Sequence, residues 1–429
     1  MKNLLTGKDT LQALNKCNRC GACTSVCPLY RHTTDESMSA RGKLALVDAV
    51  LSGRLNPGKG YADRLYTCLL CQACSANCAS GVPTTEIFLH ARRMLAESGI
   101  LPWPQRVMLN GILTGPGRFR CVVGTIDLYR LSGMQRLFKK TGLRRILPES
   151  LRLAEMRLFP ARTGQLPVGT VLEPAHSRGA VAYFTGCAVA GFFPEIARAT
   201  RRVLLRNGWK VLIPSNGCCG MPQQAYGCVE FARRLARRNI DLFIDHEAIV
   251  TDCATCGSAL KSYAALLAGD SAYGQKAAAF SAKVRDISEF LTETGFLPPE
   301  KAYFRKQTAV AYHDPCHLFR SQGIRQQPRS ILKAVPGVVL EETDGPETCC
   351  GGSGLFALTH PYLSGKVGKE KIKSILSTGA SVVTSGCPGC IMQLKAAFQM
   401  ENHGIIRVAH PVELLEASYG AGSEMPEKI

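Results

Sequence analysis

Eight cysteines near the start of the chain stand in two runs of identical spacing, and they constrain the fold more than any other feature. The pattern Cys-x2-Cys-x2-Cys-x3-Cys occurs at Cys17, Cys20, Cys23 and Cys27, and again at Cys68, Cys71, Cys74 and Cys78. Three thiolates at this spacing wrap one face of a [4Fe–4S] cubane. Zinc competes for any Cys-x2-Cys pair, but zinc sites use two separated pairs. The runs therefore predict two cubanes.

The fourth cysteine of each run is expected to bind the cluster of the other run, as in bacterial two-cluster ferredoxins. One predicted ligand set is Cys17, Cys20, Cys23 and Cys78, and the other is Cys68, Cys71, Cys74 and Cys27. Pro28 follows the first run, whereas Ala79 takes that place in the second. This difference weakens the local pattern but leaves the ligand count unchanged.

Ten further cysteines form two copies of a second pattern, in which a single cysteine precedes Cys-Cys-Gly and then Cys-x2-Cys. The first copy holds Cys187, Cys218, Cys219, Cys253 and Cys256, and the second holds Cys316, Cys349, Cys350, Cys387 and Cys390. The phrase Ala-Val-Ala-Tyr at 180–183 returns at 309–312, with the same offset of 129 as Cys187 to Cys316. The region is therefore a duplicated unit. Cys121 and Cys228 fall outside both patterns, and both are expected to be small buried core residues.

Each copy alternates short apolar runs with helical stretches. The runs AVAYFTG, KVLIP and AIVTD in the first copy correspond to AVAYHDP, VVLEE and SVVTS in the second. Strands that alternate with helices predict parallel βαβ units, and ligands bind beyond the carboxyl ends of such strands. The cysteines follow these runs and so are expected at one sheet edge.

The predicted fold class is mixed α/β, with a helical ferredoxin-like domain followed by two duplicated βαβ domains with parallel sheets. The predicted divisions are a two-cluster domain at 1–100, a basic linker or docking segment at 101–178, the duplicated domains at 179–300 and 301–420, and a disordered tail at 421–429.

Composition argues for metal ligation rather than disulfides. The 429 residues are 46% hydrophobic, no apolar run reaches 18 residues, and the opening MKNLLTGKDT lacks the apolar core of a signal peptide. The chain is expected neither to span a membrane nor to be exported by that route, which predicts a cytoplasmic location. Cytosolic thiols are kept reduced, so the cysteines are expected to bind metal.

The formal net charge of +19 is concentrated in one segment. Residues 101–178 carry 13 Lys and Arg against 4 Asp and Glu, an excess of +9. Leu131, Met134, Leu137 and Phe138 recur there at helical spacing beside Arg130, Arg136, Lys139 and Lys140. Two interpretations stay open: peripheral contact with the inner face of the cytoplasmic membrane, or a strap that joins the cysteine-bearing domains. Nucleic-acid binding is disfavoured, because no aromatic stacking motif is interleaved with the basic residues.

The duplicated pattern resembles the cysteine-rich CCG domain of heterodisulfide reductases, of the third subunit of anaerobic glycerol-3-phosphate dehydrogenase, and of glycolate and lactate oxidase iron–sulfur subunits. With the two ferredoxin runs and the phrases YHDPCHL, CCGGSG, CATCGSALK and CCGMP, the chain most resembles the glycolate oxidase iron–sulfur subunit family over about residues 12–417. The resemblance implies further iron–sulfur clusters in the CCG domains, including non-cubane [4Fe–4S] clusters, bound by the ten CCG cysteines. A zinc site using four of five cysteines is the alternative. His313 and His317 flank Cys316 and could donate to a cluster or be ordinary loop-end histidines.

The resemblance also implies the function. The chain shows no flavin or nicotinamide fingerprint and no catalytic residue for hydride removal, so an FAD-containing partner subunit is expected to oxidise the 2-hydroxy acid. The chain is then the electron-transfer subunit of a glycolate or lactate oxidoreductase complex, passing electrons to a quinone or similar acceptor. The alternative is a heterodisulfide-reductase-like subunit that reduces a disulfide at the CCG clusters.

Overall fold

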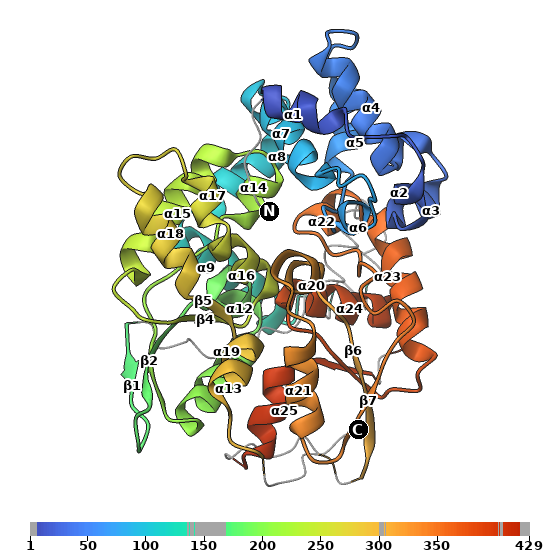
Figure 1. Cartoon of the computed structure of the whole chain (residues 1–429). Coiled ribbons are helices and arrows are strands. Elements are labelled where there is room, and N and C mark those ends of the chain that lie inside the picture. Colours follow the sequence, from blue (N-terminus) through green and yellow to red (C-terminus); the bar gives the residue numbers. More distant parts are fainter. Residues whose placement is uncertain are drawn as a thin grey trace.

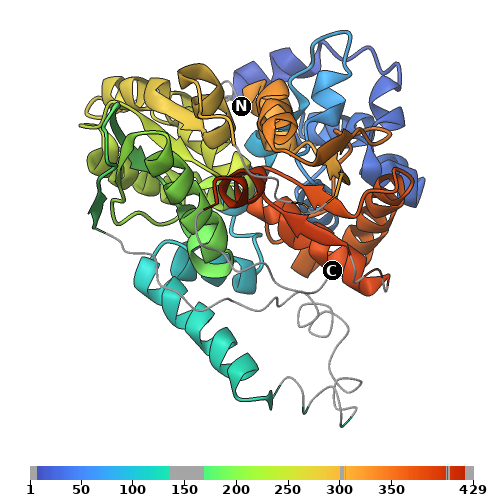
Figure 2. The same ribbon diagram turned by 90° about the horizontal axis from the view of Figure 1, so that it is seen from below.

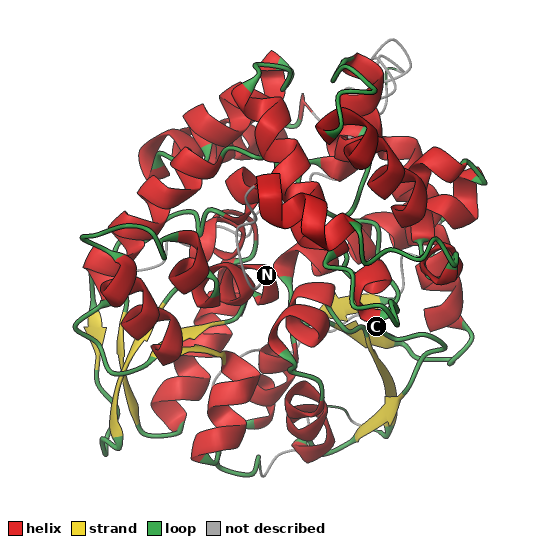
Figure 3. Ribbon diagram, turned by 45° about the horizontal axis from the view of Figure 1, so that its top comes forward, coloured by secondary structure: helices red, strands yellow, loops and turns green. Residues whose placement is uncertain are grey.

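The computed structural model of the chain describes residues 7–134, 137, 141, 169–299, 304, 306–401, 403 and 406–420. Figure 1 shows three bodies: an N-terminal group of helices lies over two α/β units that stand side by side. Helices dominate all three, and the strands form two separate sheets (Figure 3). The expected fold class, a helical ferredoxin-like part before two CCG units, is confirmed. The predicted domain limits stay predictions.

The N-terminal body consists of short helices because the two cysteine runs interrupt the chain with tight loops. Its longest helices, α4 and α7, pack together around Leu44, Val47, Ile87 and Phe88, all of them buried. Ser39 caps α4 by accepting a hydrogen bond from the Gly42 N–H at 2.9 Å. The elements are α1 (Gly7–Leu14), α2 (Ala22–Ser25), α3 (Pro28–Thr33), η1 (Glu36–Met38), α4 (Ala40–Leu51), α5 (Lys59–Tyr66), α6 (Ala73–Ala76) and α7 (Thr84–Glu97).

The first CCG unit has a five-stranded sheet in the order β1-β3-β2-β4-β5. The pairs β3–β2, β2–β4 and β4–β5 are parallel, as the βαβ pattern predicts. Its elements are β1 (Val171–Leu172), β2 (Gly179–Tyr183), α12 (Gly186–Phe192), α13 (Pro194–Arg206), β3 (Trp209–Leu212), α14 (Met221–Ala225), α15 (Val229–Phe243), β4 (Ile249–Thr251), α16 (Ala254–Lys261), α17 (Tyr263–Leu266), α18 (Gly274–Lys283), β5 (Val284–Asp286) and α19 (Ile287–Thr294).

The second CCG unit repeats this plan with a four-stranded, fully parallel sheet in the order β7-β6-β8-β9. Its elements are β6 (Thr308–Tyr312), α20 (Cys316–Gln322), α21 (Gln326–Ala334), β7 (Val338–Glu341), α22 (Phe356–Thr359), α23 (Pro361–Leu376), β8 (Val382–Thr384), α24 (Pro388–Met400), β9 (Arg407–Ala409) and α25 (Pro411–Ser418).

One continuous apolar core joins the two CCG units. It includes Val181 and Val203 from the first unit and Val310, Ile331 and Leu415 from the second. Helix α13 packs on α25, and α19 packs on α21, so each unit contributes corresponding helices to the other. This shared core fixes the two sheet edges relative to each other.

Part of the basic segment is structured and bridges the bodies. It contains α8 (Trp103–Arg106), the π-helix η2 (Val107–Ile112) and α9 (Pro116–Leu131). The Gln223 side chain donates to the Leu109 carbonyl at 2.6 Å, and Phe119 of α9 packs edge-on against Phe192 of α12. In Figure 2, α9 extends away from the body.

Two expectations about this segment change. The helix predicted to continue through Phe138 ends, as α9, at Leu131, and Phe138, Arg136, Lys139 and Lys140 lie outside the described residues. Cys121, expected in a core, is exposed on α9, whereas Cys228 is buried as expected. The antiparallel strand β1 also begins inside the segment and pairs with β3. The predicted tail at 421–429 lies outside the described residues, and none of the described helices has the length and apolarity needed to cross a membrane.

Candidate iron–sulfur sites

The two ferredoxin runs share one backbone conformation around their second cysteines. Arg19 and Gly21 flank Cys20 with φ of 53° and 84°, and Leu70 and Gln72 flank Cys71 with φ of 50° and 63°. Left-handed residues other than glycine are uncommon and cluster where the surroundings impose them. The common bend turns successive thiols toward one side, as a cluster requires.

The first run lies beside the end of the second. The Asn77 amide donates to the Ala22 carbonyl at 2.8 Å, and the Asn18 amide donates to the Ser80 hydroxyl at 3.2 Å. These bonds hold the loop that carries Cys78 against the first run. Cys20 is exposed, and the other cysteines of both runs are partly buried.

The complementary set surrounds one cavity. Cys27, Cys68, Cys71 and Cys74 line it together with Met38, Lys43 and Phe88. Burial raises the pKa of Cys27 to about 11, and the nearby Cys68 and Cys71 thiolates raise it further. The structure thus places together the thiols of the predicted crossed ligand set, although the ligation itself stays a prediction.

Two buried cations beside this cavity were not anticipated from the sequence. Lys43 is 1% exposed and donates to the Met38 carbonyl at 2.5 Å, and burial lowers its pKa. Arg92 is 2% exposed and donates to the carbonyls of Leu65 and Cys68 at 2.6 Å. Positive charge at this place offsets the negative charge of a thiolate-bound cluster. A basic residue on the inner face of each amphipathic helix was the available signal.

The five cysteines of the first CCG unit form a connected group at the carboxyl edge of its sheet. Cys187 follows β2, Cys218 and Cys219 follow β3, and Cys253 and Cys256 follow β4 at the start of α16. Side-chain hydrogen bonds join them in the order Cys187, Cys218, Cys219, Cys256 and Cys253. The hydrogen bond from Cys218 lowers the pKa of Cys219 to about 5, which favours the thiolate that binds metal.

A buried carboxyl group lies behind this cluster. Asp252, directly before Cys253, is fully buried and accepts hydrogen bonds from the Tyr183 hydroxyl and from the Thr200 hydroxyl, the latter at 2.7 Å. Burial raises the pKa of Asp252 to about 7. The hydrogen bonds tie β2, α13 and β4 together beneath the cysteine edge.

The second CCG unit places its five cysteines in the same way. Cys316 begins α20, Cys349 and Cys350 follow β7, and Cys387 and Cys390 lie at the start of α24. Hydrogen bonds connect Cys349, Cys350, Cys390 and Cys387 in that order, while Cys316 lies near Cys350 and Cys387.

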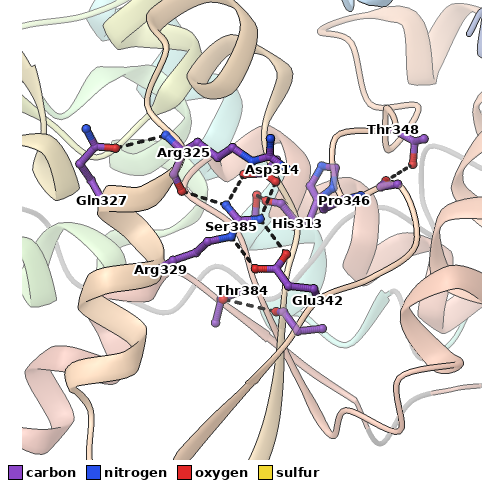
Figure 4. Close-up of polar contacts among 12 residues, drawn as sticks. His313, Asp314, Arg325, Gln327, Arg329, Glu342, Pro346, Thr348, Thr384 and Ser385 are labelled. Atoms are coloured by element: carbon purple, nitrogen blue, oxygen red, sulfur yellow. Dashed lines mark hydrogen bonds and ion pairs between the residues drawn. The ribbon is translucent and has the colours of Figure 1, made fainter.

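The loop that leads to Cys316 is anchored by a buried ion pair, shown in Figure 4. The Arg329 guanidinium binds both carboxylate oxygens of Asp314, at 2.9 and 2.7 Å, and also Glu342 at 2.6 and 2.9 Å. Arg329 also lies over the Tyr312 ring. A bidentate, buried pair of this kind fixes the loop geometry.

Two thiol contacts cross the boundaries between bodies. Cys71 of the second ferredoxin run hydrogen-bonds Cys349 of the second CCG unit, and Cys253 of the first unit hydrogen-bonds Cys387 of the second. The Arg320 guanidinium also donates to the Cys71 carbonyl at 3.1 Å. A continuous series of thiols therefore runs from the N-terminal cavity through the second CCG unit to the first.

The donor sets fit iron–sulfur centres. Soft thiolate ligands select iron–sulfur clusters or zinc, and adjacent cysteines are better used by several metal atoms than by one. We expect anaerobic metal analysis of the purified chain to find iron beyond the about eight atoms that two cubanes hold. Eight irons with stoichiometric zinc would favour structural zinc in the CCG units, and eight with no other metal would contradict metal binding there.

The parts of the chain match three families. Residues 13–82 match the 4Fe-4S dicluster domain, and residues 181–261 and 310–395 match the cysteine-rich CCG domain. Residues 101–158 match the linker region of the glycolate oxidase iron–sulfur subunit. These matches agree with the thiol geometry, and the chain is an iron–sulfur protein.

Relatives align with nearly the whole chain. The probable glycolate oxidase iron–sulfur subunit of Bacillus subtilis (strain 168) is 32% identical over 96% of this chain and 95% of its own length. The glycolate oxidase iron–sulfur subunit of Escherichia coli (strain K12) is 30% identical over 94% and 93%. One component of the dihydromethanophenazine:CoB–CoM heterodisulfide reductase of Methanosarcina acetivorans is 27% identical over 89% and 88%. The chain therefore belongs to the family of glycolate oxidase iron–sulfur subunits.

Proposed function

We propose that this chain is the electron-transfer subunit of a flavin-dependent oxidase or dehydrogenase of glycolate or lactate. An FAD-containing partner subunit oxidises the 2-hydroxy acid, and this chain carries the electrons to a quinone or similar acceptor. The observation that carries the proposal is the continuous thiol series, which crosses both body boundaries at Cys71–Cys349 and Cys253–Cys387. Iron–sulfur clusters supply one-electron transfer when bound.

The chain's own residues suit relay more than substrate chemistry. Seven of the ten CCG cysteines are buried, and Cys187, Cys316 and Cys349 are partly buried. The outer end of the series is different, because Cys20 is exposed. Buried ligands exclude water and organic substrate, and an exposed cluster edge suits electron exchange with a partner protein.

The division of labour between subunits gives a direct test. The chain purified alone is expected to contain iron and sulfide but no flavin, and to leave glycolate and lactate unoxidised with an artificial electron acceptor. Co-purification with the flavoprotein should restore oxidation coupled to reduction of a quinone analogue. Turnover of either acid by this chain alone would refute the proposal.

A heterodisulfide-reductase-like activity is the second candidate. The Cys253–Cys387 contact favours it, since the contact sets the two five-cysteine groups side by side, where a disulfide could be reduced by two centres together. Burial of most of these cysteines opposes it. Rapid reoxidation of the reduced chain by an organic disulfide, with no response to a quinone analogue, would favour this candidate.

We also propose that the basic segment touches an anionic membrane surface close to the electron exit. Helix α9 packs on α12, which carries Cys187, and its outer end exposes Leu128 and Leu131 by 67% and 75%. Met134 and Leu137 beyond it are 47% and 56% exposed. Apolar side chains among basic residues suit the headgroup boundary, where each Lys or Arg contributes about 1 kcal/mol.

Vesicle sedimentation tests this contact. The assembled complex is expected to bind anionic vesicles in a salt-sensitive manner and neutral vesicles weakly. Replacing Leu128 and Leu131 by serine should reduce binding severalfold, whereas Leu55→Ser, a 38% exposed leucine of the N-terminal body, should not. Lack of binding to either vesicle would leave the bridging contacts of Leu109 and Phe119 as the role of the segment.

A further inference from the structure

The two CCG sites differ at one corresponding position. His313 follows β6 and Phe184 follows β2, each directly after the repeated tyrosine. The backbone amides match as well: the His313 N–H donates to Thr384 at 2.9 Å, and the Phe184 N–H donates to Val250 at 2.8 Å. One site therefore has an imidazole where its copy has a hydrocarbon ring, and Phe184 packs against Phe243.

The His313 ring lies among the cysteines of the second unit. One ligand atom each from His313, Cys350 and Cys390 all lie within 4.8 Å of one another. Donors that share one metal at about 2.0 Å for nitrogen and 2.3 Å for sulfur are at most about 4.3 Å apart. The three side chains are thus close to the spacing that a single metal atom requires.

A second observation points to a ligand. His313 is 1% exposed, and its Nδ1 atom finds no hydrogen-bond partner among the described residues. An unpaired buried ring nitrogen is destabilising by about 1–3 kcal/mol. The backbone around it is fixed, since the Ser385 hydroxyl donates to the His313 carbonyl at 3.1 Å and Arg329 holds the neighbouring Asp314.

We propose that His313 is a nitrogen ligand of the metal centre in the second CCG unit and that the first centre has no such ligand. The proposal rests on the prediction that the CCG cysteines bind metal. A neutral imidazole in place of a thiolate raises the reduction potential of an iron–sulfur centre. The second centre, which lies between the N-terminal cavity and the first unit, would then be the more easily reduced of the two.

Metal retention provides the first test. His313→Phe copies the residue of the first unit and should accelerate metal loss from one centre to a chelator at least tenfold, whereas His313→Cys should retain the metal. His317→Phe is the matched control, because His317 is buried nearby but lies outside the three-residue group. Unchanged cubane signals in electron paramagnetic resonance show that each variant folds. Wild-type chelator resistance in His313→Phe overturns the proposal.

The reduction potential provides the second test. His313→Cys adds a negative ligand and should lower the potential of one centre by a tenfold change in the one-electron equilibrium constant, about 59 mV. An unchanged potential overturns direct ligation. A wild-type chain with metal in both CCG units and an indifferent His313 refutes this inference alone, whereas a wild-type chain without metal there refutes the CCG clusters as well.

Discussion

Replacing Cys27 by alanine is expected to remove the cluster of the second ferredoxin run and to leave the first run's cluster intact. Cys27 lines the same cavity as Cys68, Cys71 and Cys74, so its thiol closes that site rather than its own run's. The expected result is the loss of about four iron atoms and of one of two reduced-cluster signals in electron paramagnetic resonance.

Matched variants identify the perturbed cluster. The Cys27→Ala spectrum should resemble that of Cys74→Ala, and Cys78→Ala should resemble Cys20→Ala. Cys228→Ala, a buried cysteine outside all four groups, should keep both signals. If Cys27→Ala instead reproduces the Cys20→Ala spectrum, the crossed arrangement is wrong.

Breaking the buried ion pair of the second CCG unit is expected to have the largest effect on stability. Arg329 and Asp314 are 5% and 1% exposed at their side chains. Arg329→Met would leave the Asp314 carboxylate buried without its bidentate partner, and loss of one member of such a pair lowers the free energy of unfolding by about 3–5 kcal/mol.

Urea unfolding followed by circular dichroism, under anaerobic conditions, measures this loss. Lys333→Met on the same helix is the control, because Lys333 is exposed and its removal should change stability by less than about 0.5 kcal/mol. Equal stability of the Arg329→Met and Lys333→Met proteins would show that Glu342 and solvent relax around Asp314 without cost.

The sequence alone predicts the strands well because the duplicated apolar runs are short, β-branched and bounded by turn residues. The runs AVAYFTG and AVAYHDP correspond to β2 and β6, and the cysteines stand at the expected sheet edge. The strands β5 and β9 were not anticipated, since three residues give too little periodicity to distinguish a strand from a loop. The antiparallel pairing of β1 depends on only two residues.

The relation between the sites could not be predicted, because it depends on packing between bodies. Nothing in the spacing of Cys71 and Cys349, 278 positions apart, indicates that their thiols meet. Lys43 and Arg92 were missed for a related reason: their burial results from a cavity formed by loops far away in sequence. Cys121 shows the opposite error, since burial was inferred from residue type although α9 leaves it exposed.

Freeze-quench electron paramagnetic resonance of the assembled complex is the most direct test of electron transfer through this chain. Glycolate or lactate is added anaerobically to the complex of this chain with its flavoprotein, without an electron acceptor. The expected result is reduction of the clusters bound by this chain within the turnover time, followed by reoxidation when a quinone analogue is added. A flavin that becomes reduced while these clusters stay oxidised would contradict the proposed function.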